Sequence, residues 1–464
     1  MGATAAIAAF IANTSARDFP AQAEEKSKKA IADTFAVMIA GAGSEVADPL
    51  RNYIKASVSP GPYPVLGTGI TTASETAALV NGTFGHALDY DDVLSMMPAH
   101  PSAVILAAVL ASLNSHGSTA VSGRALIESH VLGVEVGGKI GMGMTVGHYH
   151  RGFHATGSLA LFSALASLAK LYALDEATVR QAFGIATSMS SGLRCNFGTM
   201  TKPLHTGLAA RSALSAFRLA AAGFTGSPDA LEAKAGLFAT LGVPESDVEV
   251  TVKGLGQPWV LVSPGLALKQ FPCCYATHRG MDALLTLRNS LAFNAQSVDR
   301  IICRMPPGGM EVLTFPRPTT GLEGKFSMEY CLAAGVLDGS YALRTFTDEA
   351  VRRKDIADLY QRIEVVEDPA CRGDDPQFEK RSSGSRGFVE VEARLRDGRR
   401  ETCRVASPPG APGRDLSWED LHAKFRDCAR QSGQIAESAA DQAFELLRNL
   451  EQVKDISMIA ELLR

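Results

Sequence analysis

Apolar residues recur at intervals of three and four positions from the N-terminus to about Leu268. This spacing places them on one face of an α-helix, so it predicts an amphipathic helix wherever it persists. Alanine- and leucine-rich stretches predict helices that are buried on several sides. The expected helices are Glu24–Ala40, Glu75–Leu88, Ala103–Asn114, Gly123–Ile140, Gly157–Leu174 and Ala210–Phe224. Glycine-rich joints are expected to interrupt them at 40–43, 64–69, 141–157 and 191–207.

The pattern changes after Leu268, where apolar and polar residues begin to alternate. A period of two is the pattern of a β-strand with one buried face. The expected strands are Arg300–Met305, Arg362–Glu367, Phe388–Leu395 and Arg400–Val405, with a hairpin turn at Asp397–Gly398. Helices are expected between them at Arg279–Leu291, Ser327–Leu337 and Thr347–Gln361. This order of elements is typical of an α+β domain.

A proline- and glycine-rich linker at 407–413 precedes two further expected helices, at Trp418–Arg430 and Glu437–Leu450. These helices could return to pack on the N-terminal domain. We therefore expect a mainly α protein with a smaller α+β domain. The expected boundaries are 1–268 for the first part of the helical domain, 269–408 for the α+β domain and 409–464 for the helical return.

The chain has 464 residues, with 45 basic and 49 acidic side chains and a net charge of −4. This balance argues against nonspecific nucleic-acid binding, which relies on clustered basic charge. The longest apolar run, Ala103–Ala111, is far shorter than the roughly 20 residues that span a bilayer, so no membrane segment is expected. The N-terminus has no basic residue before Arg17, and a signal peptide is not expected. Eight scattered cysteines without a CxxC pair favour a reduced, cytoplasmic protein.

Four polar clusters interrupt the apolar sequence. The first, at Gly85–Pro101, contains His86, Asp89, Asp91, Asp92 and His100 near the expected end of a helix. Carboxylates and imidazoles this close suit acid–base chemistry, because neighbouring charges push their pKa values apart. The alternative is a helix end with solvated aspartates.

The second cluster, Gly147–Thr156, contains His148, His150 and His154. Its glycines predict a bent loop that presents the imidazoles. Three closely spaced histidines could bind zinc. A metal-free polar pocket and a surface loop are the alternatives.

The third cluster contains Arg194, Lys202 and His205 in the least charged part of the chain. A lysine in such surroundings needs an anionic partner. A ligand carboxylate would supply one, and an internal lysine–aspartate pair is the alternative.

The fourth cluster, Lys269–Arg279, lies at the expected domain junction, a common place for a ligand site. Lys269 and His278 are its candidates. Cys273 and Cys274 could be nucleophiles, although cysteines of this kind are more often buried packing residues.

Together the clusters resemble the MmgE/PrpD family over nearly the whole chain. The matching segments, in the family's order, are HALDYDDV…HPS, GVEVGGKIG, GFHATGSLALF, NFGTMTKPLHTGLAAR, GFTG and KQFPCCYATH. The family includes 2-methylcitrate dehydratase, cis-aconitate decarboxylase and iminodisuccinate epimerase. The resemblance implies a large helical domain made from both chain ends, a smaller α+β lid domain, a homodimer and no cofactor or metal.

The resemblance also assigns residues. Asp89 matches the first aspartate of the family's D-[FY]-x-D motif, and His100 the histidine before Pro-Ser. His154 matches the G-[FW]-H histidine, Lys202 the T-K-P lysine, and Lys269 the lysine that opens the junction motif. These five are expected to be catalytic. The residues expected to bind substrate are Arg194, His205, Cys274 and His278.

Two departures concern the cis-aconitate decarboxylase. Cys274 stands where that enzyme has a histidine, and Val93 replaces a threonine that follows the paired aspartates. The segment GQPWVLVSPG resembles the epimerase-like members instead. We therefore expect a lyase that acts on a small di- or tricarboxylate by carbanion chemistry, first of all a 2-methylcitrate dehydratase-like enzyme. A dicarboxylate epimerase is the runner-up, ahead of a decarboxylase. A noncatalytic carboxylate-binding relative and a metal-dependent enzyme are the remaining alternatives.

Overall fold

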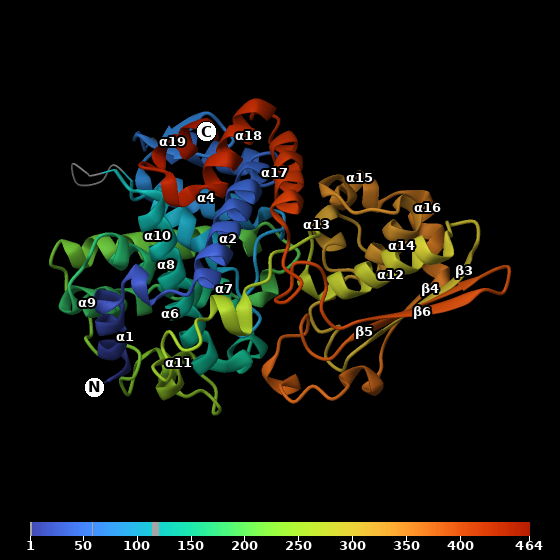
Figure 1. The fold of residues 1–464 in the computed structure, drawn as a ribbon, viewed down its shortest axis with the longest axis horizontal. Coiled ribbons are helices and arrows are strands. Elements are labelled where there is room, and N and C mark those ends of the chain that lie inside the picture. Colours follow the sequence, from blue (N-terminus) through green and yellow to red (C-terminus); the bar gives the residue numbers. More distant parts are fainter. Residues whose placement is uncertain (1, 58, 114–119) are drawn as a thin grey trace. The chain divides into compact units, whose positions relative to one another are not determined.

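The computed structural model describes residues 2–57, 59–113 and 120–464 (Figure 1). The chain divides into two compact units, each described here by itself. One comprises Met1–Leu268 and Ser417–Arg464, and the other Lys269–Leu416. The expected fold class is confirmed, because the chain is mainly α with a smaller α+β region. Among the described residues, no helix has the length and apolar character needed to cross a membrane.

In the first unit, called the helical unit below, the described residues form one two-stranded hairpin and otherwise helices with their connecting loops. Its N-terminal elements are α1 (Ala3–Asn13), α2 (Ala21–Gly41), α3 (Ala47–Ser57), β1 (Tyr63–Val65), β2 (Ile70–Thr72), α4 (Ser74–Ala87) and α5 (Pro101–Leu110). These are followed by α6 (Gly123–His150), α7 (Ala155–Ser158), α8 (Ala160–Leu171), α9 (Glu176–Thr187), α10 (Thr201–Ala221) and α11 (Leu237–Leu241). The C-terminal elements are α17 (Trp418–Ser432), α18 (Glu437–Arg448) and α19 (Ser457–Leu462).

Small residues let the helices of this unit approach closely. Gly82 of α4 faces Gly207 of α10, and a Cβ atom on Gly207 would lie 2.0 Å from the Leu79 carbonyl oxygen. Only glycine fits such a contact between backbones. The close packing of α4 on α10 brings the end of α4 beside the first turn of α10.

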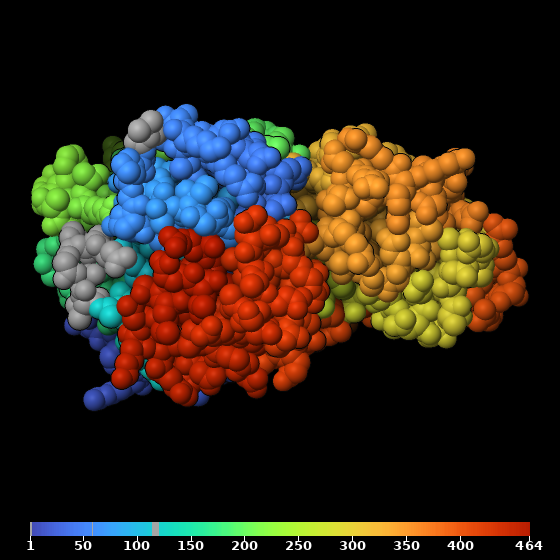
Figure 2. Space-filling model, turned by 90° about the horizontal axis from the view of Figure 1, so that it is seen from above, coloured from blue at the N-terminus to red at the C-terminus, as the bar shows by residue number. Residues whose placement is uncertain are grey.

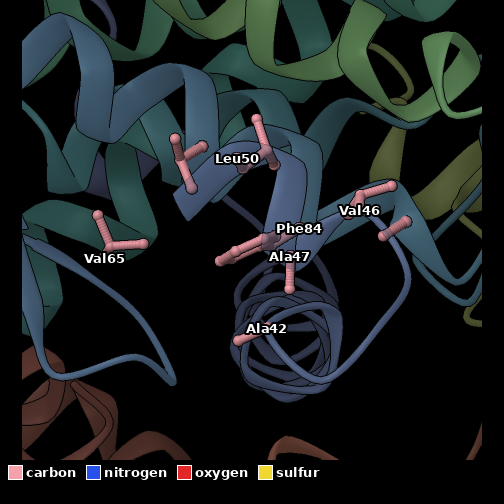
Figure 3. Packing of buried hydrophobic residues seen from close by; sticks show 8 residues of the cluster. Ala42, Val46, Ala47, Leu50, Val65 and Phe84 are labelled. Carbon is pink, nitrogen blue, oxygen red and sulfur yellow. The ribbon is translucent and has the colours of Figure 1, made fainter. Parts of the chain in front are cut away.

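A cluster of buried apolar side chains joins α2, α3 and α4 to the hairpin (Figure 3). Its members are Ala42, Val46, Ala47, Leu50, Val65, Val80, Phe84 and Ala87. Burial of an aliphatic or aromatic side chain contributes about 1.5–3 kcal/mol, so this cluster fixes α4 firmly in place.

The C-terminal helices pack on the early helices of the same unit. Figure 2 shows the last segment, in red, beside the early helices, in blue, and α17 contacts α2. Ser417 and Asp420 form a capping box at the start of α17, and Gly433 ends it with a φ of 66°. The apolar face of α17, which includes Leu421 and Phe425, is buried.

The second unit, called the α+β unit, contains a four-stranded sheet in the order β4-β3-β5-β6. Strands β3 and β4 are parallel, and the other pairs are antiparallel. The strands are β3 (Val298–Met305), β4 (Ile363–Glu367), β5 (Val389–Leu395) and β6 (Arg400–Val405). Its helices are α12 (His278–Leu291), α13 (Gly321–Gly324), α14 (Met328–Asp338), α15 (Asp348–Val351) and α16 (Lys354–Leu359). All four expected strands are confirmed, whereas the single helix expected at Thr347–Gln361 is wrong, because Arg352 and Arg353 separate α15 from α16.

Two expected glycine-rich joints are shorter than expected. Helix α6 extends to His150 with a kink at Thr145, whose φ is 63°, so the joint expected at 141–157 is confined to this kink and to residues 151–154. The second joint, 191–207, already contains the first turns of α10. Glycines of α6 provide room for neighbours rather than turns, since a Cβ on Gly141 would lie 2.5 Å from the Met97 side chain. Helix α5 ends at Leu110, and Asn114 lies outside the described residues.

Candidate active site

The first polar cluster lies directly after α4 and is buried rather than solvated. Asp89 has a φ of 50°, in the left-handed region, at the position where glycine commonly ends a helix. Aspartate is one of the few other residues that tolerate this conformation. Asp89 is 4% exposed and Asp91 is fully buried, so the alternative of surface aspartates is wrong.

A chain of polar contacts links this loop to α10. His86 Nδ1 lies 2.9 Å from Asp91 Oδ1, and because a carboxylate accepts, the imidazole donates from Nδ1. His86 Nε2 then accepts from the Lys202 ammonium at 2.8 Å. Lys202 Nζ also lies 3.1 Å from Asp89 Oδ2. The lysine is buried, and the anion that it needed is an aspartate of the first cluster.

His100 occupies the N-cap position of α5, where Pro101 begins the helix. Its Nδ1 lies 2.5 Å from the carbonyl oxygen of Asp92 and 3.5 Å from Asp91 Oδ1. Both oxygens are acceptors, so Nδ1 carries the hydrogen and Nε2 keeps its lone pair. His100 is therefore arranged as a base.

His154 and His205 face each other, with their Nδ1 atoms 3.0 Å apart. Burial, followed by the charge of Lys202, holds the pKa of His154 well below its usual range. The same two causes lower the pKa of His205 to about 4. Both imidazoles are thus neutral at neutral pH, and one donates to the other. The His154 ring centre lies 5.7 Å from that of His86 and 6.4 Å from that of His100.

Phe197 provides an apolar wall beside these groups. Its ring centre lies 5.0 Å from that of His154 and 5.2 Å from Lys202 Nζ. Arg194, which was expected to bind substrate, stacks on Tyr149 at 4.1 Å and donates to the Tyr149 carbonyl oxygen. Its role stays a prediction.

The loop is also held from the C-terminal helices. The Lys424 ammonium of α17 donates to the Tyr90 carbonyl oxygen at 2.8 Å and lies 3.7 Å from the centre of the Tyr90 ring. It pairs with Asp33 of α2 at 2.6 Å. Neither Lys424 nor Asp33 was singled out by the sequence analysis. The only feature of the sequence that could have indicated them is that each is a charged residue on an otherwise apolar helix face.

Among the described residues, two groups of side chains could hold a metal ion. The ligand atoms of His86, His100 and His154 lie within 4.8 Å of one another, as do those of His86, Asp89, Asp91 and His100. The expected loop of three histidines does not form such a group, because His148 instead contacts the Leu241 carbonyl oxygen and Ser158 Oγ. A divalent cation on His86 Nε2 would meet the ammonium of Lys202, which opposes its binding.

The remaining candidates belong to the α+β unit. His278 packs between the rings of Phe271 and Tyr275, and the backbone nitrogen of Cys274 donates to the Lys325 carbonyl oxygen. Cys273 is fully buried, as a packing residue would be. The roles expected for Lys269, Cys274 and His278 stay predictions, which substitution of each residue can test.

Acid should destabilise the helical unit through His205. The unfolded chain takes up a proton near the ordinary histidine pKa of 6.5, but folded His205 does so only near about 4. Its contribution of about 3 kcal/mol is therefore complete above pH 6.5 and is lost as the pH falls to about 4. Urea unfolding across this range should show a shallower loss of stability for His205→Gln than for the parent chain. Equal slopes would contradict the assignment.

Comparison with known proteins gives a consistent result. Residues 5–248 match the MmgE/PrpD N-terminal domain, and residues 271–451 match the MmgE/PrpD C-terminal domain. A cis-aconitate decarboxylase from Mus musculus is 28% identical over 95% of this chain and 88% of its own length. The Homo sapiens protein of the same name is 27% identical over 95% of this chain and 90% of its own length. An Aspergillus terreus protein, also named cis-aconitate decarboxylase, is 26% identical over 100% of this chain and 96% of its own length.

Proposed function

Because the chain belongs to the MmgE/PrpD family, we propose that it is a lyase acting on a small polycarboxylate through a carbanion next to a carboxylate. One observation carries this proposal. A buried ammonium, Lys202, lies within the same contact network as a base, His100, and both side chains are directed by aspartates. Carbanion chemistry next to a carboxylate needs this combination, because the negative charge that forms must be neutralised where it develops.

Lys202 is proposed to bind the substrate carboxylate that becomes the enolate. Burial strengthens this charge interaction, because a preorganised cation in a dry site does not have to compete with water. The amino-terminal ends of α5 and α10, where His100 and Lys202 lie, add positive potential that favours an anionic ligand.

His100 Nε2 is proposed to take the proton from the carbon next to that carboxylate. The electron pair of the broken C–H bond then moves into the carboxylate. In a dehydration the neighbouring C–O bond breaks, a C=C bond forms and the departing hydroxide takes up a proton to leave as water. We propose His154 as the source of that proton. Burial and then the charge of Lys202 keep its pKa low, and substrate carboxylates would offset that charge.

The first candidate reaction is the dehydration of a hydroxy-tricarboxylate such as 2-methylcitrate. The second is the decarboxylation of cis-aconitate, which the names of the relatives favour. In that reaction a C–C bond breaks, CO₂ leaves and the carbanion is protonated. Epimerisation of a dicarboxylate would use the same carbanion, with a proton returned to the opposite face. We further propose that the chain works as a homodimer in the cytoplasm. Light scattering of the purified protein can test the oligomeric state.

An NMR assay of a tricarboxylate and dicarboxylate panel in D₂O separates these reactions. New alkene carbon signals in the ¹³C spectrum without loss of carbon identify dehydration, and loss of CO₂ identifies decarboxylation. Deuterium uptake at a substrate carbon without loss of water or CO₂ identifies epimerisation. Absence of all three changes across the panel would contradict the proposed function.

Exhaustive dialysis against EDTA should leave the activity unchanged, because a cation beside His86 Nε2 would be repelled by Lys202. Metal content by elemental analysis and activity are measured together. Activity that disappears with EDTA and returns with a divalent ion would overturn this prediction.

A further inference from the structure

A second chain of buried polar groups lies behind the loop that carries the site. Ser102 Oγ of α5 contacts Asp92 Oδ2 and lies 2.8 Å from His130 Nε2 of α6. His130 Nδ1 lies 2.9 Å from Ser27 Oγ of α2. The side chains of all four residues are fully buried. The proposed reaction assigns no role to any of them.

The surroundings of Asp92 disfavour a negative charge on it. Its Oδ1 is buried without a hydrogen-bond partner among the described residues, and no lysine or arginine is paired with it there. Two other carboxylates, Asp91 and Asp33, repel a negative charge on Asp92, and the ammonium of Lys424 is paired with Asp33. Burial, which is the largest cause, and these two carboxylates raise the pKa of Asp92 well above its usual value, against the effect of Ser102.

His130 cannot supply the missing charge. Burial lowers its pKa to about 3, so the imidazole is neutral. A neutral Asp92 allows one consistent direction of hydrogen bonds along the chain. Ser102 Oγ would donate to Asp92 Oδ2 if that carboxylate were ionised, and with a neutral Asp92 this hydrogen bond is reversed. The carboxyl O–H then donates to Ser102 Oγ, Ser102 to His130 Nε2, and His130 Nδ1–H to Ser27 Oγ. Oδ1 is then an uncharged carbonyl oxygen, which a buried site tolerates better than a bare carboxylate oxygen.

This chain bears directly on His100, because the backbone carbonyl of Asp92 accepts from His100 Nδ1. We propose that Asp92 is held as a neutral carboxylic acid and that, through Ser102 and His130, it positions this carbonyl so that His100 stays a neutral base. Asp91 is then the only charged carboxylate of the adjacent pair. A second negative charge beside His100 would favour its imidazolium form, which cannot accept a proton. Asp92 is a positioning residue in this scheme, and the inference rests on the proposed role of His100.

The activity test compares two substitutions of Asp92 with one of its neighbour, Asp91. Asp92→Ala should lower kcat by about 10-fold or more and move the acid limb of the pH profile of kcat/KM, because the backbone carbonyl that accepts from His100 is no longer held in place by the side chain of residue 92. Asp92→Asn has the shape and neutrality of the protonated acid, and it should restore most of the loss. Asp91→Asn, which removes the true charge, should not be tolerated. Asp92→Asn as damaging as Asp92→Ala would overturn the proposal.

Two spectroscopic measurements test the proposal about Asp92 independently of catalytic turnover. The infrared difference spectrum between the parent chain and Asp92→Asn should show loss of a protonated-carboxyl C=O band. Nitrogen-15 shifts of labelled histidines should show His100 in the Nδ1–H form in the parent chain and in Asp92→Asn, but not in Asp92→Ala. If Asp92→Ala does not fold, Ser102→Ala takes its place, with the same expected change at His100. An unchanged infrared spectrum, or a His100 tautomer insensitive to these substitutions, would overturn the proposal even in a chain with normal activity. An inactive chain that shows both signatures would instead contradict only the proposed function.

Discussion

Replacement of Lys202 by methionine should nearly abolish turnover while leaving the fold intact. The ammonium pairs with Asp89 at 3.1 Å and contacts His86 at 2.8 Å, and in the proposed reaction it neutralises the substrate carboxylate. Loss of one partner of a buried charge pair typically costs about 2–5 kcal/mol, which corresponds to a decrease of about 30- to 5,000-fold in kcat/KM. Steady-state kinetics of Lys202→Met measure the loss of turnover, and circular dichroism measures whether the fold is retained.

Lys139→Met is the matched control, because Lys139 is an equally buried lysine of the same unit with a structural environment. It lies 3.8 Å from Glu135 and donates to the Gly254 carbonyl oxygen at 2.7 Å. Its loss should lower the melting temperature and leave the kcat/KM of the folded protein within about threefold. Near-normal turnover by Lys202→Met would show that this ammonium is also structural and that the substrate binds elsewhere.

Replacement of His100 by glutamine should have the second largest effect. Glutamine fills a similar volume but cannot accept the substrate proton, and removal of a general base typically costs about 10²- to 10⁴-fold. Both turnover and exchange of the substrate C–H for deuterium should fall together, because they share the proton-transfer step. Proton NMR in D₂O follows the two processes in one sample.

His422→Gln serves as the control for loss of an imidazole. His422 lies on α17, pairs with Asp441 at 2.9 Å and has no contact with the site groups described above. Its replacement should leave kcat/KM within about threefold. If His154→Gln abolishes the exchange while His100→Gln retains it, the base is His154 and the roles of the two imidazoles must be reversed.

Local spacing was enough to predict most helices and every strand of the four-stranded sheet. The spacing did not predict the structure at glycines, because a glycine can permit either a turn or close packing. The glycines of 141–157 were interpreted as joints, but Gly141 lies inside α6 because Met97 occupies the space that a Cβ would need. A single sequence does not distinguish a glycine that permits a turn from one that permits close packing, since the difference lies in a distant neighbour.

The groups of the proposed site were singled out from the sequence where they lie close together in it. His100, Asp89 and Asp91 stand in one short segment, and the structure brings Lys202 and His154 to them through the packing of α10 and α7. The groups that were missed act from far along the chain. His130 looked like one polar residue in an apolar helix, and such a residue needs a partner that spacing alone cannot identify. Resemblance to a family helped with the residues of its motifs and gave no information about these supporting groups.

The helical return has a consequence for the order in which the protein is made. Lys424, which holds the Tyr90 carbonyl, lies 334 residues after it in the chain. The ion pair between Asp33 and Lys424 therefore forms only after Asp89, His100, His154 and Lys202 have all been translated. A ribosome stalled before α17 would release a polypeptide that carries each of these four groups but lacks the ammonium that fixes their loop. Translation of α17 thus supplies the last of these groups, and if the proposed function is correct, a chain truncated before α17 should be inactive rather than partly active.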